Sequence, residues 1–330
     1  MESVNFLSVL IAVASLVILG VPAFVLVKLK ALPKSAAEVL STIALYVCSP
    51  AQILMSFQKT SFNPAIGKNI LIVFGLSFVA FTLMIILVNL FLRGKSQELK
   101  RRVCRFAVVF PNCGYMGIPF LQMLFSNPAI QGEAILYTAI TISIFHVYSW
   151  TYGVYSISKD KRNISIKNII LNPCIISVVL GFILFIGFKK PIVELAEVGT
   201  TAHTILSSLV KSINFMGDMV TPVAMFVIGI KLANVNLKQL FLDKWAYIAT
   251  ALRLIIMPMI IIFLVVFLPV PQIVKFCMFF LFAMPSATNT AMFAIKYGGD
   301  GDFASIEVLL STVLSIITIP IMFLFFQLFI

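Results

Sequence analysis

Two apolar segments of this chain are interrupted by proline and polar residues at matching places in its two halves. The first interruption is Phe-Pro-Asn-Cys-Gly-Tyr-Met-Gly-Ile-Pro at 110–119, and the second is Met-Pro-Ser-Ala-Thr-Asn-Thr at 284–290. Proline removes a backbone donor and clashes with the preceding turn, so it ends a helix. A helix broken at membrane depth persists only where protein or a water-lined cavity satisfies the freed backbone groups. Both breaks must therefore face the protein interior or a cavity rather than lipid.

The composition excludes a soluble globule. Hydrophobic residues make up 61% of the chain and charged residues 11%, with a mean hydropathy of +1.09, whereas soluble domains are about half apolar and a quarter charged. We expect an all-α polytopic membrane protein, because each span needs about 20 apolar residues. Ten spans are expected, at 5–28, 36–58, 69–92, 104–125, 131–157, 168–188, 201–233, 245–268, 273–295 and 303–329.

Lys and Arg residues are distributed unequally between the connections. With the N-terminus outside, seventeen of the 24 fall on the inner side, in 28–34, 93–105, 159–167 and 231–244 and at Lys296. The six on the outer side are Lys59, Lys68, Lys189, Lys190, Lys211 and Lys275. The positive-inside rule then predicts a plasma-membrane protein with both termini outside. The net charge of +12 is assigned to contact with anionic lipid of the bilayer, and no nucleic-acid partner is expected.

The ends of the chain and its cysteines add few further constraints. We expect no cleavable signal peptide, because residues 1–3 carry no basic side chain and the first apolar run is of full span length. The five cysteines lie in or beside spans without CxxC spacing, so neither disulfides nor a metal site is expected, and no cofactor is indicated. They are Cys48, Cys104, Cys113, Cys174 and Cys277.

The two halves of the chain align with one another. Ser49-Pro50 in the second expected span aligns with Thr221-Pro222 in the seventh at an offset of 172 residues, and Pro111 aligns with Pro285 at an offset of 174. Each half holds five expected spans, and an odd count makes the second half enter the membrane from the opposite side. We therefore expect two inverted five-helix repeats whose broken fourth and ninth spans cross. Crossed broken helices form the substrate site of secondary transporters, and their half-helix N-termini favour an anion.

Taken together, these motifs resemble the auxin efflux carrier family, whose bacterial members include carriers assigned to malate and malonate. The resemblance covers nearly the whole chain and implies a ten-helix fold related to that of bile-acid symporters. It rests on Pro-Asn-Cys-Gly-Tyr-Met-Gly-Ile-Pro at 111–119, Thr-Pro-Val-Ala-Met-Phe-Val-Ile-Gly at 221–229, Ala-Met-Pro-Ser-Ala at 283–287, Val-Leu-Leu-Ser-Thr at 308–312 and Thr-Ile-Pro at 318–320.

The resemblance also implies two domains with different roles. Residues 1–58 and 166–235 would form a scaffold that often dimerises, and residues 64–157 and 241–330 would form a moving transport domain. The implied function is not enzymatic: it is alternating-access transport, of elevator type, of an organic anion such as an auxin-like monocarboxylate, malate or malonate. Efflux is the expected direction, and cation-coupled uptake is the alternative.

The chain departs from plant members of that family in three places. Plant carriers have an Asn where Phe110 stands here, and an aspartate in the third span, where this chain offers Ser77, Thr82 and Asn89. These departures argue against auxin as the substrate. The connection at 158–167 is also too short for the regulatory loop of the long plant carriers.

The expected substrate site centres on the two breaks. Asn112 is expected either to donate its amide to a carboxylate or to cap the following half-helix. Ser286, Thr288 and Asn289 hold the equivalent place in the ninth span, where Ser and Thr also bond back to their own backbone. The other candidates around the breaks are Pro111, Cys113, Tyr115, Met116 and Pro285.

Residues of other spans are expected to reach the same site. Gln52 is an amide in an apolar span and needs a partner, which a substrate can supply. Pro50 and Pro222 are expected kinks on opposite sides of the site. Arg253 lies eight residues into the eighth span, where its charge must pair with an anionic substrate, anchor the moving domain or snorkel to the interface.

The signals for a coupling proton or sodium ion are weaker. His146 is the one intramembrane histidine, and its side chain titrates near neutral pH, although a neutral structural histidine is the simpler interpretation. Asp218 precedes Pro222 by four residues and either binds a cation or caps a helix. Asp300, Asp302 and Glu307 are interpreted as a solvated turn before the tenth span.

Two other functions fit parts of the sequence. Gly-Asp-Gly-Asp at 299–302 matches the Gly-x-Gly-Asp string of intramembrane aspartyl proteases, which need a second carboxylate sharing a proton. That carboxylate would have to be Asp218, which lacks the expected preceding tyrosine. A channel is the other alternative. The paired breaks and the expected inverted repeat favour a carrier over both.

Overall fold

The protein is described here from a computed structural model, which covers residues 4–33, 35–59, 63–94, 97–234 and 243–330. Across these residues the secondary structure is helical, apart from one isolated pair of residues in β-bridge geometry. Three basic residues of the expected inner side, Lys34, Lys95 and Lys238, lie outside the described residues, as do residues 1–3.

The helices follow the expected spans closely. The first three spans are α1 (Phe6–Lys28), then α2 (Ala36–Ile43) with η1 (Ala44–Cys48) and α3 (Ser49–Gln58), then α4 (Pro64–Phe91). The fifth is α7 (Pro128–Tyr148), η3 (Ser149–Gly153) and α8 (Val154–Ser158). The short η4 (Lys161–Asn163) and α9 (Ile166–Ile170) lead to the sixth, α10 (Pro173–Phe188), and η5 (Ile192–Leu195) follows it. The seventh is α11 (Thr201–Asp218) and α12 (Val220–Asn234), the eighth is α14 (Lys244–Ala251), η6 (Leu252–Ile256) and α15 (Met257–Val266), and the tenth is α18 (Gly301–Gln327).

The fourth and ninth expected spans are each broken in two. The fourth consists of α5 (Glu98–Val109), then η2 (Cys113–Gly117) and α6 (Ile118–Leu124), and the ninth of α16 (Gln272–Ala283) and α17 (Thr290–Lys296). Eight stretches among the described residues are long and apolar enough to cross a membrane, and they correspond to the other eight expected spans. The total of ten crossings and the inverted repeat therefore stay predictions.

Three of the helices begin at an Asn-Pro pair. Asn63, Asn127 and Asn172 each accept a hydrogen bond from a backbone N–H of the first turn through the side chain. The proline that follows each of them stands at the start of the helix, where its missing N–H costs nothing. Side-chain chemistry in the sequence thus fixes where α4, α7 and α10 start.

The expected kinks at Pro50 and Pro222 coincide with local irregularities. The π-helical η1 ends one residue before Ser49-Pro50, and its wider turn accommodates the proline that follows. Pro222 lies three residues after Met219, which separates α11 from α12. A comparable π-helical turn, η6, precedes Pro258 in α15.

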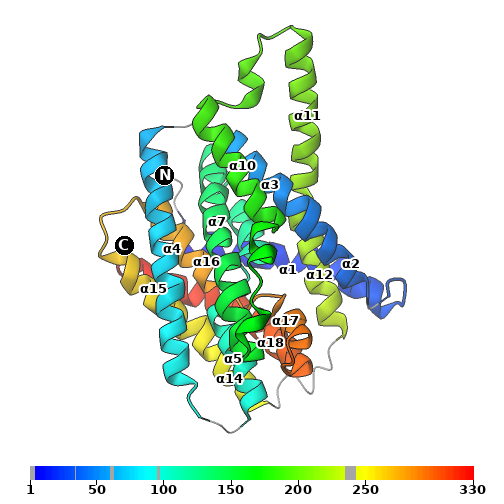
Figure 1. Ribbon diagram of the computed structural model, residues 1–330, viewed down its shortest axis with the longest axis vertical. Coiled ribbons are helices and arrows are strands. Elements are labelled where there is room, and N and C mark those ends of the chain that lie inside the picture. The colour runs from blue at the N-terminus through cyan, green and yellow to red at the C-terminus, as the bar shows by residue number, and fades with distance from the viewer. Residues whose placement is uncertain (1–3, 34, 60–62, 95–96, 235–242) are drawn as a thin grey trace.

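The helices pack in two groups. In one, α1 and α2 pack along α12, and α3 packs along α10 and α11. In the other, α4 packs on α7, α14 packs on α5 and α18, and α15 packs on α16. Figure 1 shows α10 and α11 projecting at the top, while α5, α14, α17 and α18 gather at the bottom. The first group holds the helices expected to form the scaffold, and the second those expected to move; the motion itself stays a prediction.

The contact between α1 and α12 is close enough to require glycine. A Cβ atom placed on Gly229 would lie 2.2 Å from the carbonyl oxygen of Gly20. Small residues let two membrane helices approach backbone to backbone and gain dispersion contacts. The two glycines thus set the spacing of the central helix pair in the first group.

Polar side chains of the third expected span pair with the fifth. These pairs are Ser77 with Thr141 (3.0 Å), Thr82 with Tyr148 (2.6 Å) and Asn89 with Tyr152 (2.8 Å). Because polar groups away from water need partners, the three pairs fix how α4 lies against α7 and η3. They also explain Ser77, Thr82 and Asn89 as packing residues.

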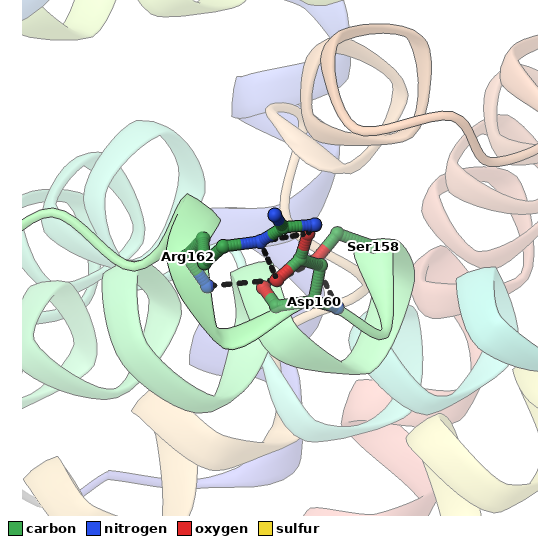
Figure 2. A network of polar contacts seen from close by, with 3 residues as sticks. All are labelled: Ser158, Asp160 and Arg162. Atoms are coloured by element: carbon green, nitrogen blue, oxygen red, sulfur yellow. Dashed lines mark hydrogen bonds and ion pairs between the residues drawn. The ribbon is translucent and has the colours of Figure 1, made fainter.

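The connection between α8 and α9 is a short, self-bonded turn. The Asp160 carboxylate accepts from the Arg162 guanidinium at 2.8 and 3.0 Å and from its backbone N–H at 2.9 Å (Figure 2). The Ser158 hydroxyl accepts from the Asp160 backbone N–H at 3.1 Å. These hydrogen bonds from Arg162 hold the pKa of Asp160 below its usual value. The connection at 158–167 is therefore a compact turn, as its short length in the sequence predicts.

Candidate functional site at the crossing of the broken helices

The two breaks meet each other. The Asn112 N–H donates to the Pro285 carbonyl oxygen at 2.7 Å, and the Ala287 N–H donates to the Phe110 carbonyl oxygen at 2.9 Å. The two segments run antiparallel at this point, as an isolated β-bridge. The backbone groups released by the prolines therefore find partners in each other rather than in lipid. This is the crossing that two inverted repeats predict.

Arg253 braces the crossing from η6. Its guanidinium donates to the Val108 carbonyl oxygen at 2.8 Å and to that of Val109 at 3.4 Å, and also to the carbonyl oxygen of Phe282. Those carbonyls end α5 and α16, where a helix leaves its last acceptors unpaired and its dipole is negative. Arg253 is fully buried. Of the three roles expected for it, the geometry fits anchoring.

Phe110 belongs to an aromatic cluster behind the crossing. Its ring centroid lies 4.6 Å from Phe106, 5.4 Å from Phe145 and 6.1 Å from Phe81. All four rings are buried. In this chain the position before Pro111 therefore supplies packing and offers no polar group to a ligand.

The side chains of Asn112 and Asn289 have hydrogen-bonding capacity to spare. Each stands directly before a second half-helix, yet neither makes a side-chain capping bond. Among the described residues, the buried Asn112 Nδ2 donor has no hydrogen-bond partner, and neither has the Asn289 Oδ1 acceptor. A buried amide that lacks a partner costs free energy unless a ligand or water supplies one.

The other residues expected at the crossing are placed around it with differing exposure. Pro111, Cys113, Met116, Pro285, Ser286 and Thr288 are buried, and Tyr115 is half-buried. The Tyr115 hydroxyl donates to the Ser41 carbonyl oxygen of α2 at 3.0 Å. Tyr115 is thus already engaged with the other helix group, while the remaining residues line the crossing itself.

Lys231 reaches the crossing from α12. Its ammonium donates to the Thr288 carbonyl oxygen at 2.9 Å, within the break of the ninth span. The sequence predicts Lys231 among the basic residues of an inner connection, because it lies at the end of the seventh expected span, and in the structure it lies three residues before the end of α12. The site therefore has a cation from the first helix group that the sequence pattern did not reveal.

Gln52 and Asp218 lie at a separate cavity between the helix groups. The cavity is small and opens partly to solvent. Its lining residues are Gln52, Met55, Ser56, Lys59, Gln122, Ile135, Asn214, Gly217 and Asp218. Neither polar atom of the buried Gln52 amide has a hydrogen-bond partner. The exposed Asp218 accepts from Asn214 of the same helix at 2.7 Å.

Glu307 corrects one prediction from the sequence. We interpreted it as part of a solvated turn, but it lies six residues into α18 and is fully buried. Its Oε1 accepts from the Ser286 hydroxyl at 2.7 Å. Asp300 accepts from the Phe303 N–H at 2.9 Å and caps α18, and Asp302 is exposed, so these two do form the expected turn.

A polar stripe in the sequence could have revealed Glu307. Glu307, Ser311 and Ser315 recur every four residues, which places them on one face of a helix, and all three are fully buried. His146, by contrast, is buried in α7 with its ring edge-on to Phe145, at a centroid distance of 5.3 Å. That packing agrees with a structural histidine.

Fold and crossing together define the class: an all-helical membrane protein in which two broken helices meet inside the helix bundle. Comparison with known proteins gives the family. A family described as membrane transport protein matches residues 8–169 and 159–323. The chain belongs to this family, in which the auxin efflux carriers are grouped.

Two curated relatives are similar along most of their length. An uncharacterised transporter of Methanocaldococcus jannaschii is 23% identical over 300 residues, covering 86% of this chain and 88% of that protein. A Rhizobium meliloti protein provisionally named a malonate transporter is 25% identical over 295 residues, covering 87% of this chain and 86% of that protein.

Proposed function

We propose that this protein is a secondary transporter that binds a small organic anion, of the malonate or malate class, at the crossing of α5–η2 with α16–α17. The observation that carries the proposal is the Asn112 Nδ2 donor, which is buried at the crossing without a partner. A substrate carboxylate is the partner that such a donor favours.

Charge at the crossing supports an anion. The Lys231 ammonium lies at the break of the ninth span, bonded to a backbone carbonyl rather than to a carboxylate. The second half-helices, η2–α6 and α17, are short, so the proposal rests on Lys231 and Asn112 rather than on helix dipoles. A ligand with two carboxylates can engage both residues, one carboxylate at each.

The space at the crossing favours a small substrate. The Phe110 cluster fills the space behind the crossing with buried aromatic rings. A short dicarboxylate needs only the polar rim of the crossing, whereas an auxin would need room for an indole ring as well. The name of the Rhizobium meliloti relative agrees with this preference.

Alternating access would require the second helix group to move against the first. Among the described residues, hydrogen bonds that join the groups are Tyr115 to Ser41, Thr221 to Gln122, Lys231 to Thr288 and Gln327 to Val4. In our proposal these bonds break and re-form as residues 64–157 and 241–330 carry the substrate past the scaffold. The movement is of the elevator type, and dimerisation through the scaffold would hold the scaffold still while the second helix group moves.

The membrane potential favours efflux of the anion. Moving one elementary charge across 100 mV is worth about 2.3 kcal/mol, which corresponds to about a 50-fold gradient at 1.4 kcal/mol per decade. An inside-negative plasma membrane therefore expels an anion that moves alone. Uptake would need a co-transported cation. We place the basic connections inside and both termini outside, in accordance with the positive-inside rule.

The proposal separates a carrier from the two alternatives. Asp302, the aspartate that ends the Gly-x-Gly-Asp string, is exposed at the start of α18, and Asp218 accepts from Asn214, which favours a carrier over an aspartyl protease. Mutating Asp218 and Asp302 together would abolish a protease but leave anion binding at the crossing intact. A channel would show voltage-driven current that saturates only weakly with substrate, whereas a carrier saturates.

A thermal-shift panel tests the proposal. The purified protein is heated with malonate, malate, longer dicarboxylates or indole-3-acetate, in sodium and in choline buffers. A ligand at 100 times its Kd stabilises the native state by about 2.7 kcal/mol. We expect short dicarboxylates to raise the transition temperature and Asn112→Ala to remove that rise. No shift with any of these anions would overturn the proposed substrate class.

A further inference from the structure

A second polar site adjoins the crossing on the side of α18. Glu307 is fully buried, and of its two carboxyl oxygens only Oε1 has a partner, the Ser286 hydroxyl. Oε2 is buried and has no hydrogen-bond partner in the part of the chain that the structure describes. An ionised carboxylate with one neutral donor and no counter-ion contact is strongly disfavoured away from water.

Ser286 connects this carboxyl to the crossing. Its side chain donates to Glu307, and its backbone N–H donates to the Ser311 hydroxyl at 3.2 Å. Ser286 is itself a member of the β-bridge with Pro111. A change in the charge of Glu307 is therefore felt one hydrogen bond away from the proposed substrate site.

The surroundings of Glu307 contain few other charges. The groups that act on it electrostatically are the Arg253 guanidinium from η6 and the Cys104 thiol from α5. The two terminal nitrogens of Arg253 donate to the carbonyl oxygens of Val108, Val109 and Phe282, while its buried Nε has no partner among the described residues. Within the described residues Glu307 forms no ion pair, and Lys100 of α5, which lies over the Phe303 ring of α18, is paired with Asp243. The carboxyl therefore has no ion-pair partner among the described residues, and only the Ser286 hydrogen bond and the charge of Arg253 oppose the cost of its burial.

We infer that Glu307 is the coupling site of the transporter, where a proton binds at Oε2 together with the substrate anion. This inference rests on the proposed function. A sodium ion would need several oxygen ligands, whereas a proton needs only the vacant Oε2. In the described residues there is also no cluster of three or more acidic, His or Cys side chains.

The hydrogen bond to Ser286 explains how proton and anion binding are linked. While Glu307 is ionised, the Ser286 hydroxyl must donate to it, and the negative charge repels a second carboxylate. When a proton from solvent occupies Oε2, the charge disappears and the Ser286 hydroxyl is free to donate to the substrate. Proton and anion thus bind cooperatively, so each transport cycle carries one proton with the anion. Malonate carries two negative charges, so a cycle that also moves one proton still transfers one net negative charge, which the inside-negative potential expels.

Calorimetry of malonate binding tests this inference. Titrations of the purified protein in two buffers of different ionisation enthalpy give the number of protons taken up per malonate bound. Linkage predicts about one more proton for the wild type than for Glu307→Gln, and a wild-type affinity that falls up to about tenfold per pH unit at alkaline pH. Protonation of malonate itself cancels in the comparison, because both proteins bind the same ligand.

Two variants act as controls. Glu133→Gln removes another carboxyl of the membrane helices, at α7, and should take up as many protons as the wild type. Glu307→Asp should keep a pH-dependent affinity and so shows that the site tolerates substitution. Equal proton uptake by wild type and Glu307→Gln would overturn the inference while leaving the carrier proposal standing.

Two further outcomes separate this inference from the function on which it rests. If sodium strengthens malonate binding in the wild type but not in Glu307→Gln, without proton uptake, the site belongs to sodium and the proton assignment is wrong. If neither malonate, malate nor indole-3-acetate binds the wild type at any pH, the proposed function fails and the inference falls with it.

Discussion

The ammonium of Lys231 donates to the carbonyl oxygen of Thr288 at 2.9 Å, and this bond ties α12 to the break of the ninth span. The hydrogen bond of Lys231 goes to a backbone carbonyl rather than to a carboxylate, and Glu38 acts on its charge only electrostatically. The position joins the substrate site to the interface between the two helix groups.

Replacing Lys231 by glutamine should weaken malonate binding at least tenfold. A charge-assisted hydrogen bond contributes about 1.5–3 kcal/mol, and tenfold corresponds to 1.4 kcal/mol. Lys231→Arg should retain most of the affinity because it keeps the charge. Binding is measured by calorimetry, with Lys211→Gln on the exposed face of α11 as the control. Unchanged affinity in Lys231→Gln would remove this residue from the site.

Asn112→Ala should abolish detectable malonate binding without loss of folded protein. Its Nδ2 bonds to no protein group, so the substitution breaks no side-chain donor bond inside the fold. The backbone bond from Asn112 to Pro285 remains available to alanine. The measurement pairs gel-filtration yield with a ligand-induced thermal shift. A variant that binds malonate as the wild type does would contradict the crossing as the substrate site.

Arg253→Met should destabilise the protein whether or not ligand is present. The change leaves the buried carbonyl oxygens of Val108 and Phe282 without a donor, and hydrogen bonds to a charged group contribute about 1.5–3 kcal/mol each. We expect a loss of about 3 kcal/mol or more in the free energy of unfolding. Arg253→Lys should recover only part, because a single ammonium lacks the planar fork that spans two helix ends. The exposed Arg162→Lys is the control.

Gly229→Ala tests the close contact of α1 with α12. The added Cβ would lie 2.2 Å from the Gly20 carbonyl oxygen, which forces the helices apart. Overpacking of this kind costs about 1–3 kcal/mol, and we expect a lower transition temperature in detergent. Gly75→Ala, which meets no atom within 4 Å, should be neutral or slightly stabilising because alanine favours helix. Equal stability of the two variants would show that the α1–α12 contact adapts.

The ion pair of Lys100 with Asp243, outside the spans, predicts a pH dependence. Burial of Asp243 opposes ionisation, but hydrogen bonds from Lys100 and from the Trp245 backbone N–H outweigh it and lower the pKa of Asp243. Its stabilising contribution is thus complete above the unfolded pKa of about 4 and is lost as the pH falls through the lower folded value. Asp243→Asn should unfold more easily than wild type at neutral pH, by about 0.5–1 kcal/mol.

That difference should vanish in acid, where both proteins lack the carboxylate charge. Thermal unfolding at a series of pH values measures it. Glu98→Gln, which breaks the more exposed pair with Arg102, is the control and should change stability little at any pH. A gap between Asp243→Asn and wild type that persists undiminished in acid would show that the ion pair is not its cause.

The sequence predicts the spans and the two breaks well because hydropathy and proline act locally. Asn-Pro pairs and apolar run lengths are properties of adjacent residues, so helix starts such as Asn63-Pro64 follow from them. The direction in which a side chain points depends on packing between distant segments. Glu307 shows this. Its nearness to Asp300 in the sequence suggests a turn, but it lies on a face of α18 that points toward Ser286, 21 residues away in the sequence.

Lys231 and Arg253 illustrate the same limit for charges. Both are recognisable as basic residues at or within spans, but whether each meets solvent, substrate or backbone depends on which carbonyls the folded chain brings near. Arg253 bonds to Val108, 145 positions earlier in the chain, and no local pattern encodes that meeting. The sequence therefore predicts where the candidate site is centred, but which atoms its charged side chains contact can be learned only from the folded structure.

The brace formed by Arg253 also bears on the order in which the chain is completed during synthesis. The end of α5 emerges from the ribosome long before its guanidinium partner, and the carbonyl oxygen of Phe282 follows 29 positions after Arg253. A nascent protein that stops short of the eighth span keeps the carbonyls of Val108 and Val109 unpaired inside the bilayer. The crossing is thus a late assembly step, and a fragment containing only the first half should be recognised as unfinished by membrane quality control.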